Sequence, residues 1–430
     1  MLTRDERGSV LGGLPLRDVF ASEVSGGIRT PAYVYDLDAM VAEVEALRAG
    51  FGGAPHLVAY AVKASSAGPI VRALASAGAG AEVVSGGELA VATACGVPPD
   101  RVLFSGVAKQ AWELDRAIGA GDRGILAIQM ESVEEIARVE ARAAALGRRA
   151  RVSLRVNPGV EADTHAHVAT GHDEAKFGIA RADLGAAWEA LARARHLDLV
   201  GLGSHVGSQL TATGEYLAAA EVILAVAAER QARQAAGAAL SFLDFGGGFG
   251  IDYGAGCQAT PADFARAATR LLAGSPLAGL RLVVEPGRCL VAAFGVLVAS
   301  VIGSKVASAE GRRWLMIDAG MNDLMRPALY AARHRIEPLE GAVSAGAPAW
   351  RVVGPVCESS DDFGEHPFAA PPARVVIRDA GAYGFTMASE YNGRPLPAEV
   401  FVRGGRIAAV HVPRGVDAWV ADRVGIGERR

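Results

Sequence analysis

The chain has 430 residues, of which 51% are hydrophobic and 21% charged, and its formal net charge is −4. This length suits two domains, or one large barrel with an addition. The composition is that of a globular protein, and the weak negative charge argues against a protein held to nucleic acid by a basic surface. The longest apolar run, Leu290–Gly303, is too short to span a bilayer. The N-terminus resembles no secretory leader, so we expect a cytoplasmic protein whose four cysteines are reduced.

Short apolar runs alternate with Ala-rich amphipathic stretches between residues 56 and 286. Amphipathic periodicity predicts helices, for example over Ser132–Leu146 and Tyr216–Ala236. Alternating strands and helices imply parallel pairing, and about eight such units predict a (β/α)8 barrel of the α/β class. The predicted strands are His56–Lys63, Ala81–Val84, Val102–Phe104, Ile125–Gln129, Arg151–Val156, Leu199–Ser204, Phe242–Phe245 and Leu282–Glu285.

The pattern changes after Pro286, where long helical stretches largely disappear. Short β-branched segments separated by Gly- or Pro-containing breaks predict a mostly β domain. We expect a barrel domain over 33–286 and a second domain formed by 1–32 and 287–430. Tyr33–Tyr35 is a strand pattern outside the eight, so the first residues can belong with the second domain. The predicted strands there are Leu290–Ile302, Trp314–Asp318, Arg351–Val356, Ala373–Asp379, Glu399–Val402 and Arg406–Val412.

Lys63 closes the first predicted barrel strand. In barrels of this type the chemistry lies where strands end and the following loops begin. A lysine at the end of a buried strand loses solvation, which favours the neutral amine that forms a Schiff base. Taken alone, a lysine at a strand end is more often a surface charge whose stem packs on apolar groups.

His205 follows the sixth predicted strand, and the glycine-rich segment Gly246–Gly250 follows the seventh. An imidazole between small residues can stack on a flat ring, although a histidine satisfied by hydrogen bonds is an equal alternative. Successive glycine N–H groups can bind a phosphate, and the loops after strands seven and eight commonly do so. A tight turn is the alternative for the glycines. The spacing is not that of a dinucleotide fingerprint.

Glu285 ends the eighth predicted strand, in the segment Glu285-Pro286-Gly287-Arg288. A carboxylate at that depth needs a cationic or hydrogen-bonding partner. Arg288 is an available structural partner, and the functional alternative is a protonated pyridinium nitrogen. An amine, a stacking group, a phosphate site and a buried carboxylate are together what pyridoxal 5'-phosphate requires. The sequence therefore predicts this cofactor and gives no sign of a metal site.

The same segments resemble the decarboxylases of the alanine racemase fold, and the second half narrows the resemblance to the diaminopimelate decarboxylase family. The resemblance runs from about residue 30 to about residue 402, nearly the whole chain. The motifs that carry it are Tyr60–Ala64, Val83–Leu89, His205–Gln209, Gly246–Gly250, Glu285–Arg288, Arg326–Tyr330, Gly354–Ser359, Ala382–Gly384 and Tyr391–Pro395.

The resemblance implies roles for individual residues. Lys63 would carry the cofactor, with His205 against its ring, and Cys357 would enter the active site from a second subunit. It therefore implies a homodimer with shared sites, and either Cys357 or Lys63 as the acid that protonates Cα. The other implied cofactor residues are Ser208, Gly247, Gly248, Glu285, Gly287, Arg288 and Tyr383. The implied substrate residues are Arg288, Arg326, Tyr330, Glu358 and Tyr383.

One position departs from the family pattern, because relatives commonly have aspartate where this chain has Glu82. The extra methylene can change a contact near the cofactor.

The charges of the implied substrate residues favour meso-diaminopimelate, which is converted to lysine in the last step of lysine biosynthesis. Arg288 and Arg326 suit the carboxylate at its far end, because a guanidinium binds a carboxylate at two points. Glu358 suits the ammonium there. A related decarboxylase acting on ornithine, arginine, or a modified or carrier-bound amino acid is the alternative. A racemase is less favoured, because racemases of this fold generally set a guanidinium against the ring nitrogen, where this chain has Glu285. A non-catalytic homologue is also less favoured, because it need not retain Lys63, Glu285 and Cys357.

Overall fold

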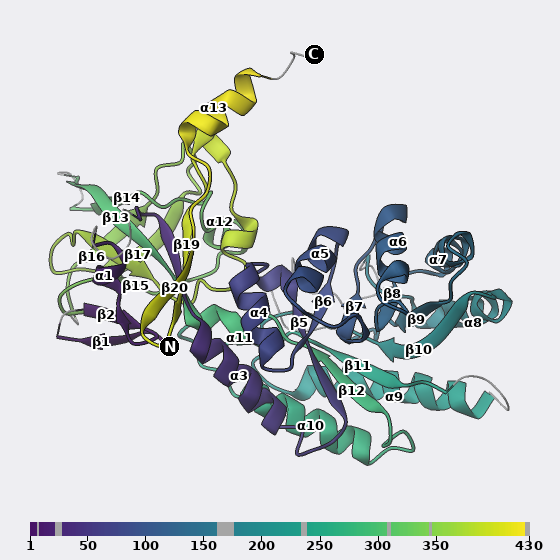
Figure 1. Cartoon of the computed structure of the whole chain (residues 1–430). Helices are drawn as coiled ribbons and strands as arrows, with labels where there is room; N and C mark the ends of the chain where they lie inside the picture. The colour runs from purple at the N-terminus through teal and green to yellow at the C-terminus, as the bar shows by residue number, and fades with distance from the viewer. Residues whose placement is uncertain are drawn as a thin grey trace. The chain divides into compact units, whose positions relative to one another are not determined.

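A computed structural model of the chain describes residues 1–6, 8–21, 28–160, 176–233, 239–307, 311–343 and 346–425. The chain divides into two units (Figure 1). One comprises Val41–Asp252 and Gly256–Leu290, and the other comprises Met1–Met40, Tyr253–Ala255 and Val291–Arg430.

The first unit is built on a closed parallel barrel, with strands in the order β10-β11-β12-β5-β6-β7-β8-β9. This is the predicted (β/α)8 barrel. Its strands are β5 (His56–Ala61), β6 (Gly80–Val83), β7 (Val102–Phe104), β8 (Ala127–Met130), β9 (Ala150–Arg155), β10 (Leu197–Gly203), β11 (Phe242–Gly247) and β12 (Arg281–Glu285). Each lies within a few residues of its prediction. The barrel closes because β12 pairs with β5, so the last strand lies beside the first.

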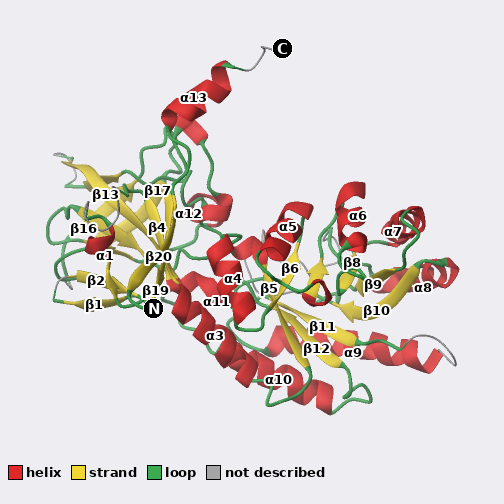
Figure 2. Ribbon diagram, viewed as in Figure 1, coloured by secondary structure: helices red, strands yellow, loops and turns green. Residues whose placement is uncertain are grey.

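Helices surround these strands (Figure 2). The predicted helices at 132–146 and 216–236 correspond to α7 and α9, although residues 234–236 lie outside the described residues. The helices that alternate with the strands are α4 (Gly68–Ser76), α5 (Gly86–Ala94), α6 (Ala111–Gly119), α7 (Val133–Ala145), α8 (Leu184–Arg193), α9 (Gly214–Arg233) and α10 (Pro261–Ala273), and α3 (Leu37–Ala49) precedes β5.

The residues of the motif Val83–Leu89 have a structural role, because they form the start of α5. The Ser85 hydroxyl accepts a hydrogen bond from the Glu88 N–H (3.2 Å), and the Glu88 carboxylate accepts one from the Val84 N–H (2.9 Å). Such reciprocal bonds satisfy N–H groups that a helix start leaves unpaired.

Apolar side chains fill the barrel near the amino-terminal ends of its strands. Phe242, the first residue of β11, belongs to this buried cluster. A Cβ at Gly201 of β10 would lie 2.3 Å from its ring, so only glycine fits beside it. The other buried members of the cluster are Leu57, Ala59, Leu103, Leu126, Ala127 and Val283. Polar side chains are thereby left to the opposite, carboxyl end.

The second unit is mostly β, which confirms the predicted fold class. A sheet runs in the order β17-β16-β14-β13-β4-β19-β20, β18 pairs with β13 and β15, and β1-β2-β3 form a small separate sheet. The strands are β1 (Thr3–Asp5), β2 (Gly8–Leu11), β3 (Leu14–Pro15), β4 (Ala32–Asp36), β13 (Gly295–Val306), β14 (Arg313–Ile317), β15 (Ile336–Pro338), β16 (Ala349–Val353), β17 (Asp362–Pro367), β18 (Arg374–Ile377), β19 (Ala398–Arg403) and β20 (Arg406–His411). Its short helices are α1 (Leu16–Val19), α12 (Arg326–Tyr330) and α13 (Val416–Val424).

The prediction of one strand over residues 290–302 is wrong in its first part. The segment begins with the end of α11 (Arg288–Val291) and the 3-10 turn Ala292–Phe294, and β13 starts only at Gly295. All of Cys289–Ala292 is buried. An apolar run that is buried on every side has no periodicity by which a helical turn differs from a strand.

Candidate active site

Lys63 lies in the 3-10 turn Val62–Ala64, directly after β5. Its ammonium group forms an ion pair with Glu82, with 2.8 Å between Nζ and Oε2. Glu82 comes from the neighbouring strand β6, where it pairs with Ala61, and its side chain is only 1% exposed. The residue that departs from the family pattern is therefore the ion-pair partner of Lys63. The sequence marks Glu82 as unusual but gives no sign of this contact.

Glu285, the last residue of β12, and Asp244 of the neighbouring strand β11 form an acidic pair. Both side chains are buried. Burial raises the pKa of Glu285 well above its usual range, and the nearby carboxyl of Asp244 raises it further. Burial likewise raises the pKa of Asp244 to about 6. Sequence reasoning missed Asp244, although an acid inside the apolar strand Phe242–Phe245 is a detectable signal.

His205 follows β10 and lies between this acidic pair and the glycine segment. Its Nδ1 accepts a hydrogen bond from the Gly247 N–H (3.2 Å) and lies 3.8 Å from Oε2 of Glu285. Burial lowers the pKa of His205 well below its usual range, and the positive charges of Arg155 and Lys63 lower it further. The ring is therefore neutral at neutral pH, with its proton on Nε2 because Nδ1 is an acceptor. A neutral ring is suited to lie against an aromatic cofactor.

Arg155 is a second residue that sequence reasoning missed. It ends β9, and its guanidinium forms a buried ion pair with Glu131 (3.0 Å). Its charge acts on His205, so it belongs to the same electrostatic environment. The signal in the sequence that could have identified Arg155 is its position as a charged residue at the end of an apolar strand.

The glycines after β11 are required by close backbone packing. A Cβ at Gly246, Gly247 or Gly248 would lie 2.3, 2.0 or 2.4 Å from a backbone oxygen of a neighbouring segment. Two of their N–H groups are engaged within the chain, since Gly246 donates to Asp244 (2.9 Å) and Gly247 to His205. This packing accounts for the glycines without a phosphate, so their role as a phosphate site stays a prediction.

Ser208 and Arg288 are joined by a hydrogen bond, with 2.9 Å between Nη2 of Arg288 and the hydroxyl oxygen. Arg288 is buried and lies three residues after Glu285, beyond Gly287. The loops after β10 and β12 thus meet at the carboxyl end of the barrel.

The remaining predicted residues lie in the mostly β unit. Arg326 begins α12 and is buried, and its Nη1 donates to the Tyr253 hydroxyl and to Nε2 of His334, each at 3.0 Å. His334 Nδ1 lies 2.8 Å from the Arg378 carbonyl oxygen, to which it donates because Nε2 is an acceptor. The neutral side chains of Tyr253 and His334 therefore help to hold the Arg326 guanidinium in position. Sequence reasoning missed Tyr253 and His334.

Cys357 and Glu358 lie at the surface of this unit. The Cys357 N–H donates to the Asn392 side chain (3.0 Å), and Cys357 itself is exposed. The Tyr391 hydroxyl donates to the Glu358 carboxylate (2.5 Å). Two family motifs, Gly354–Ser359 and Tyr391–Pro395, are therefore in contact. Tyr330 ends α12, and Tyr383 has a positive φ of 55°.

The residues at the carboxyl end of the barrel fit pyridoxal phosphate. Oε1 of Glu285 is buried and accepts no hydrogen bond from an N–H or hydroxyl group of the described residues. A buried carboxylate oxygen without a donor is costly, and the N–H of a protonated ring nitrogen would satisfy it. Lys63 supplies the amine and His205 a neutral ring. Within the described part of the chain, no group of three or more His, Cys, Asp or Glu side chains is arranged to hold a metal.

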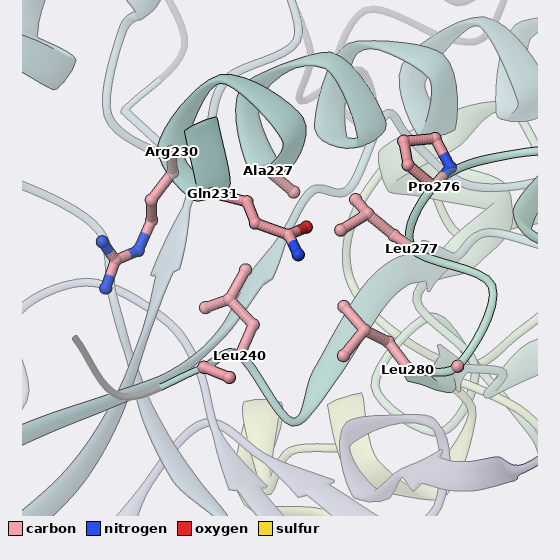
Figure 3. A pocket seen from close by; sticks show the side chains of 9 residues that line it. Ala227, Arg230, Gln231, Leu240, Pro276, Leu277 and Leu280 are labelled. Carbon is pink, nitrogen blue, oxygen red and sulfur yellow. The ribbon is translucent and has the colours of Figure 1, made fainter. Parts of the chain in front are cut away.

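A different cavity lies at the amino-terminal ends of β11 and β12 (Figure 3). It has a volume of about 360 Å³, and the side chains of Leu240, Leu277 and Leu280 face the same space. Arg230 points away from that space. Gln231 also faces this space, and the described lining residues include no acid, lysine or histidine of the kind found at the carboxyl end.

Comparisons with known proteins identify the family of the chain. Residues 37–292, more than half of the chain, match the family described as "Pyridoxal-dependent decarboxylase, pyridoxal binding domain". The fold and the site thus define a pyridoxal-dependent decarboxylase. The chain is also 39% identical to a diaminopimelate decarboxylase of Zymomonas mobilis, over 96% of each chain, and 42% identical to one of Neisseria meningitidis, over 92% of this chain and 95% of the relative. It belongs to the diaminopimelate decarboxylase family.

Solved structures agree with the family. The diaminopimelate decarboxylase of M. jannaschii in complex with L-lysine superimposes with a TM-score of 0.87 at 30% identity, covering 98% of this chain and 97% of that one. The Helicobacter pylori enzyme complexed with L-lysine gives a TM-score of 0.82 at 34% identity, covering 93% of this chain and 98% of that one. No helix in the described part of the chain is long and apolar enough to cross a membrane.

Proposed function

We propose that this chain decarboxylates meso-2,6-diaminopimelate to L-lysine and carbon dioxide, using pyridoxal 5'-phosphate. The observation that carries the proposal is that Lys63, held by Glu82, and a buried Glu285 whose Oε1 needs a donor follow or end the neighbouring strands β5 and β12. An amine and a carboxylate in this arrangement hold the two ends of a pyridoxal ring system. The lysine complexes of the relatives support the choice of product.

Each barrel residue has a defined task in this mechanism. When bound, pyridoxal phosphate supplies an electron sink for the pair released as the bond between Cα and the carboxylate breaks. Lys63 supplies the amine that holds the cofactor, and Glu285 holds the proton on the ring nitrogen. His205 supports the ring without adding charge. Cα then takes up a proton in place of the lost carbon dioxide, and Lys63 and Cys357 are the candidate donors.

Arg326 supports the substrate assignment. Diaminopimelate differs from lysine and ornithine in the carboxylate at its far end, and a buried guanidinium fixed by neutral Tyr253 and His334 suits that group. We assign Arg288, Tyr330, Glu358 and Tyr383 to the same end of the substrate from the family pattern.

The test is a decarboxylation assay on the purified, cofactor-loaded protein with diaminopimelate, ornithine, arginine and lysine offered separately. We expect lysine and carbon dioxide from diaminopimelate alone. Arg326→Ala should raise KM for diaminopimelate about tenfold or more, the value of one lost charge-assisted contact. Arg326→Lys is the matched control, since it keeps the charge but loses the two-point fork. An unchanged KM in Arg326→Ala would remove Arg326 from the substrate site, and turnover of ornithine instead would replace the substrate.

We also propose a cytoplasmic homodimer in which Cys357 acts in the site of the partner subunit. The exposure of Cys357 and its contact with Asn392 support this role, because an exposed thiol held by its backbone can reach another subunit. Inactive Lys63→Ala and Cys357→Ala proteins should regain part of the activity when they are unfolded and refolded together. Absence of any regained activity in a mixture shown to contain mixed dimers would contradict shared sites.

A further inference from the structure

The amino-terminal end of the barrel carries a basic cavity of about 260 Å³. Its lining includes His56 and Arg281, the first residues of β5 and β12, and Arg101, which directly precedes β7. Arg48 joins them from α3. Because β12, β5, β6 and β7 are consecutive in the barrel, these four side chains come together at one place. No Asp or Glu is among the described residues that line it.

Backbone carbonyls hold two of the guanidinium groups in position. Arg48 Nη1 donates to the Ala77 carbonyl (2.8 Å), and Arg101 Nη1 donates to the Gly78 carbonyl (3.3 Å). Gly78 has a φ of +86°, and a Cβ there would lie 2.8 Å from Arg48 Nη1. The turn at Gly78 therefore leaves room for Arg48 because it has no side chain. These acceptors are neutral, so they orient the guanidinium groups without neutralising them.

His56 adds a second kind of donor group, an imidazole, to the lining. Its ring stacks on Phe51, with 4.3 Å between the centroids, and its Nδ1 interacts with the Ala54 carbonyl (2.8 Å). Burial lowers the pKa of His56, and the positive charges of Arg48 and Arg281 lower it further. The cavity therefore has enough positive charge to disfavour one more cation.

None of the lining arginines forms an ion pair with another described residue. Two acids at this end of the barrel interact with other arginines, since Asp198 pairs with Arg149, and Asp100 acts on Arg151. Arg281 also repels Arg151 across the same end of the barrel. The like charges gathered here are thus not balanced within the lining.

We propose that this cavity binds a small oxyanion with two or more negative charges. Guanidinium groups bind phosphoryl and carboxylate oxygens through paired N–H donors, and fixed groups lose little freedom when they do so. The site lies at the end of the barrel opposite Lys63, so it is separate from the cofactor site. The cavity of Figure 3 lies at the same end, but Arg230 is the one charged side chain among its described lining residues, and Leu240, Leu277 and Leu280 face its interior.

The test is calorimetric titration of the cofactor-loaded enzyme, in which the cofactor already fills its own phosphate site. Pyrophosphate and citrate are titrated separately at constant ionic strength, which distinguishes phosphoryl from carboxylate ligands. We expect saturable binding of at least one of them. Arg101→Gln and Arg281→Gln should each weaken it about tenfold, the value of one charge-assisted hydrogen bond. Arg116→Gln, which removes an exposed guanidinium from α6 of the same barrel, is the matched control and should leave binding unchanged.

Each result decides the proposal. Weakening in both cavity variants, with Arg116→Gln at wild-type affinity, supports a built site. Absence of saturable binding by both anions overturns it. Equal weakening in all three variants also overturns it, because net charge alone would then explain the binding. Thermal melts check that each variant is folded, and having two cavity variants retains the test if one of them is not.

Discussion

The two ends of the barrel differ in charge and in burial: buried carboxylates lie at the carboxyl end, and exposed arginines lie at the amino-terminal end. At the carboxyl end, the carboxylates of Glu82, Asp244 and Glu285 are buried, and cationic Lys63 lies among them. At the amino-terminal end, arginines are exposed and lack acidic partners in the lining of the cavity. Buried charge in a low-dielectric site shifts pKa values and prepares chemistry, whereas exposed charge is screened by solvent and can only attract ions. From this difference in burial we expect covalent chemistry at the carboxyl end of the barrel and only ion binding at the amino-terminal end.

The largest expected effect tests the buried end. Lys63→Ala removes the only amine that we assign to the cofactor, so turnover should fall by roughly a thousandfold or more. The absorbance band of the lysine-bound cofactor should disappear as well. Lys305→Ala, which removes an exposed lysine of β13, is the control and should keep both. Wild-type rates in Lys63→Ala would remove the functional distinction between the two ends.

The next effect concerns Glu285. Glu285→Gln keeps the shape of the side chain but loses the charge that holds the ring proton, and kcat should fall by about a hundredfold, the order of one lost electrostatic contact in a buried site. Cofactor release on dialysis should be faster. A kcat within twofold of wild type would assign Glu285 a structural role alone.

Glu285→Gln should lower kcat but, as pH rises, should increase the stability of the protein relative to the wild type. Folding raises the pKa of Glu285, so the folded protein keeps a proton that the unfolded chain loses as pH rises. The wild type therefore loses stability as pH increases above the usual carboxyl range, and the Gln variant escapes this loss. For the cofactor-free proteins, the melting temperature of the variant minus that of the wild type should increase between pH 5 and pH 8. A constant difference would show that the Glu285 carboxyl does not titrate in this range.

A smaller effect is expected at Glu82. Glu82→Gln removes the carboxylate that holds the Lys63 ammonium, and kcat/KM should fall about tenfold, the value of one charge-assisted hydrogen bond. Glu82→Asp keeps the charge, matches the residue common in the family, and should retain most activity. Cofactor attachment to the apoenzyme, followed by absorbance, should become faster at neutral pH in the Gln variant because the amine is less held in its charged form. An equal loss of activity in both variants would point to packing rather than charge.

The smallest effect tests the exposed end. The Arg151 side chain has no hydrogen bond or ion pair with another described residue, and burial and the charges of Arg123 and Arg281 lower its pKa. Arg151→Gln should therefore stabilise the protein slightly, by about 0.5 kcal/mol, at low ionic strength. Denaturant melts in 20 mM and 500 mM salt measure the gain, which should shrink in the higher salt because screening already weakens the repulsion. A loss of stability at low salt would show that Arg151 is bound rather than repelled.

The sequence predicted the barrel well because its strands are short and apolar and most of them alternate with longer helices. Strand β7 was predicted at its observed bounds, and the others within a few residues. The edge strands β1, β15 and β17 were not predicted, because two of them are only three residues long and β17 carries polar residues throughout most of its length. Strands of this kind are fixed by their pairing partners rather than by their own pattern.

The candidate site was predicted where chemistry and chain position coincide. Lys63, His205 and Glu285 lie at or just after the carboxyl ends of barrel strands, where functional groups lie in barrels of this type. The contact between Lys63 and Glu82 and the influence of Arg155 on His205 join residues far apart in the chain, and no local pattern records such distances. The Arg326 partners Tyr253 and His334 were missed for the same reason.

The pairing of β12 with β5 also orders events during synthesis. The ribosome makes the lysine strand early and the Glu285 strand more than two hundred residues later. Until β12 emerges, a nascent chain has Lys63 beside an open sheet edge and no carboxylate for the ring nitrogen. We therefore expect cofactor capture to follow translation of the whole barrel. A chain stalled before β12 would expose a reactive amine and an unpaired strand, which are features that chaperones and proteases recognise.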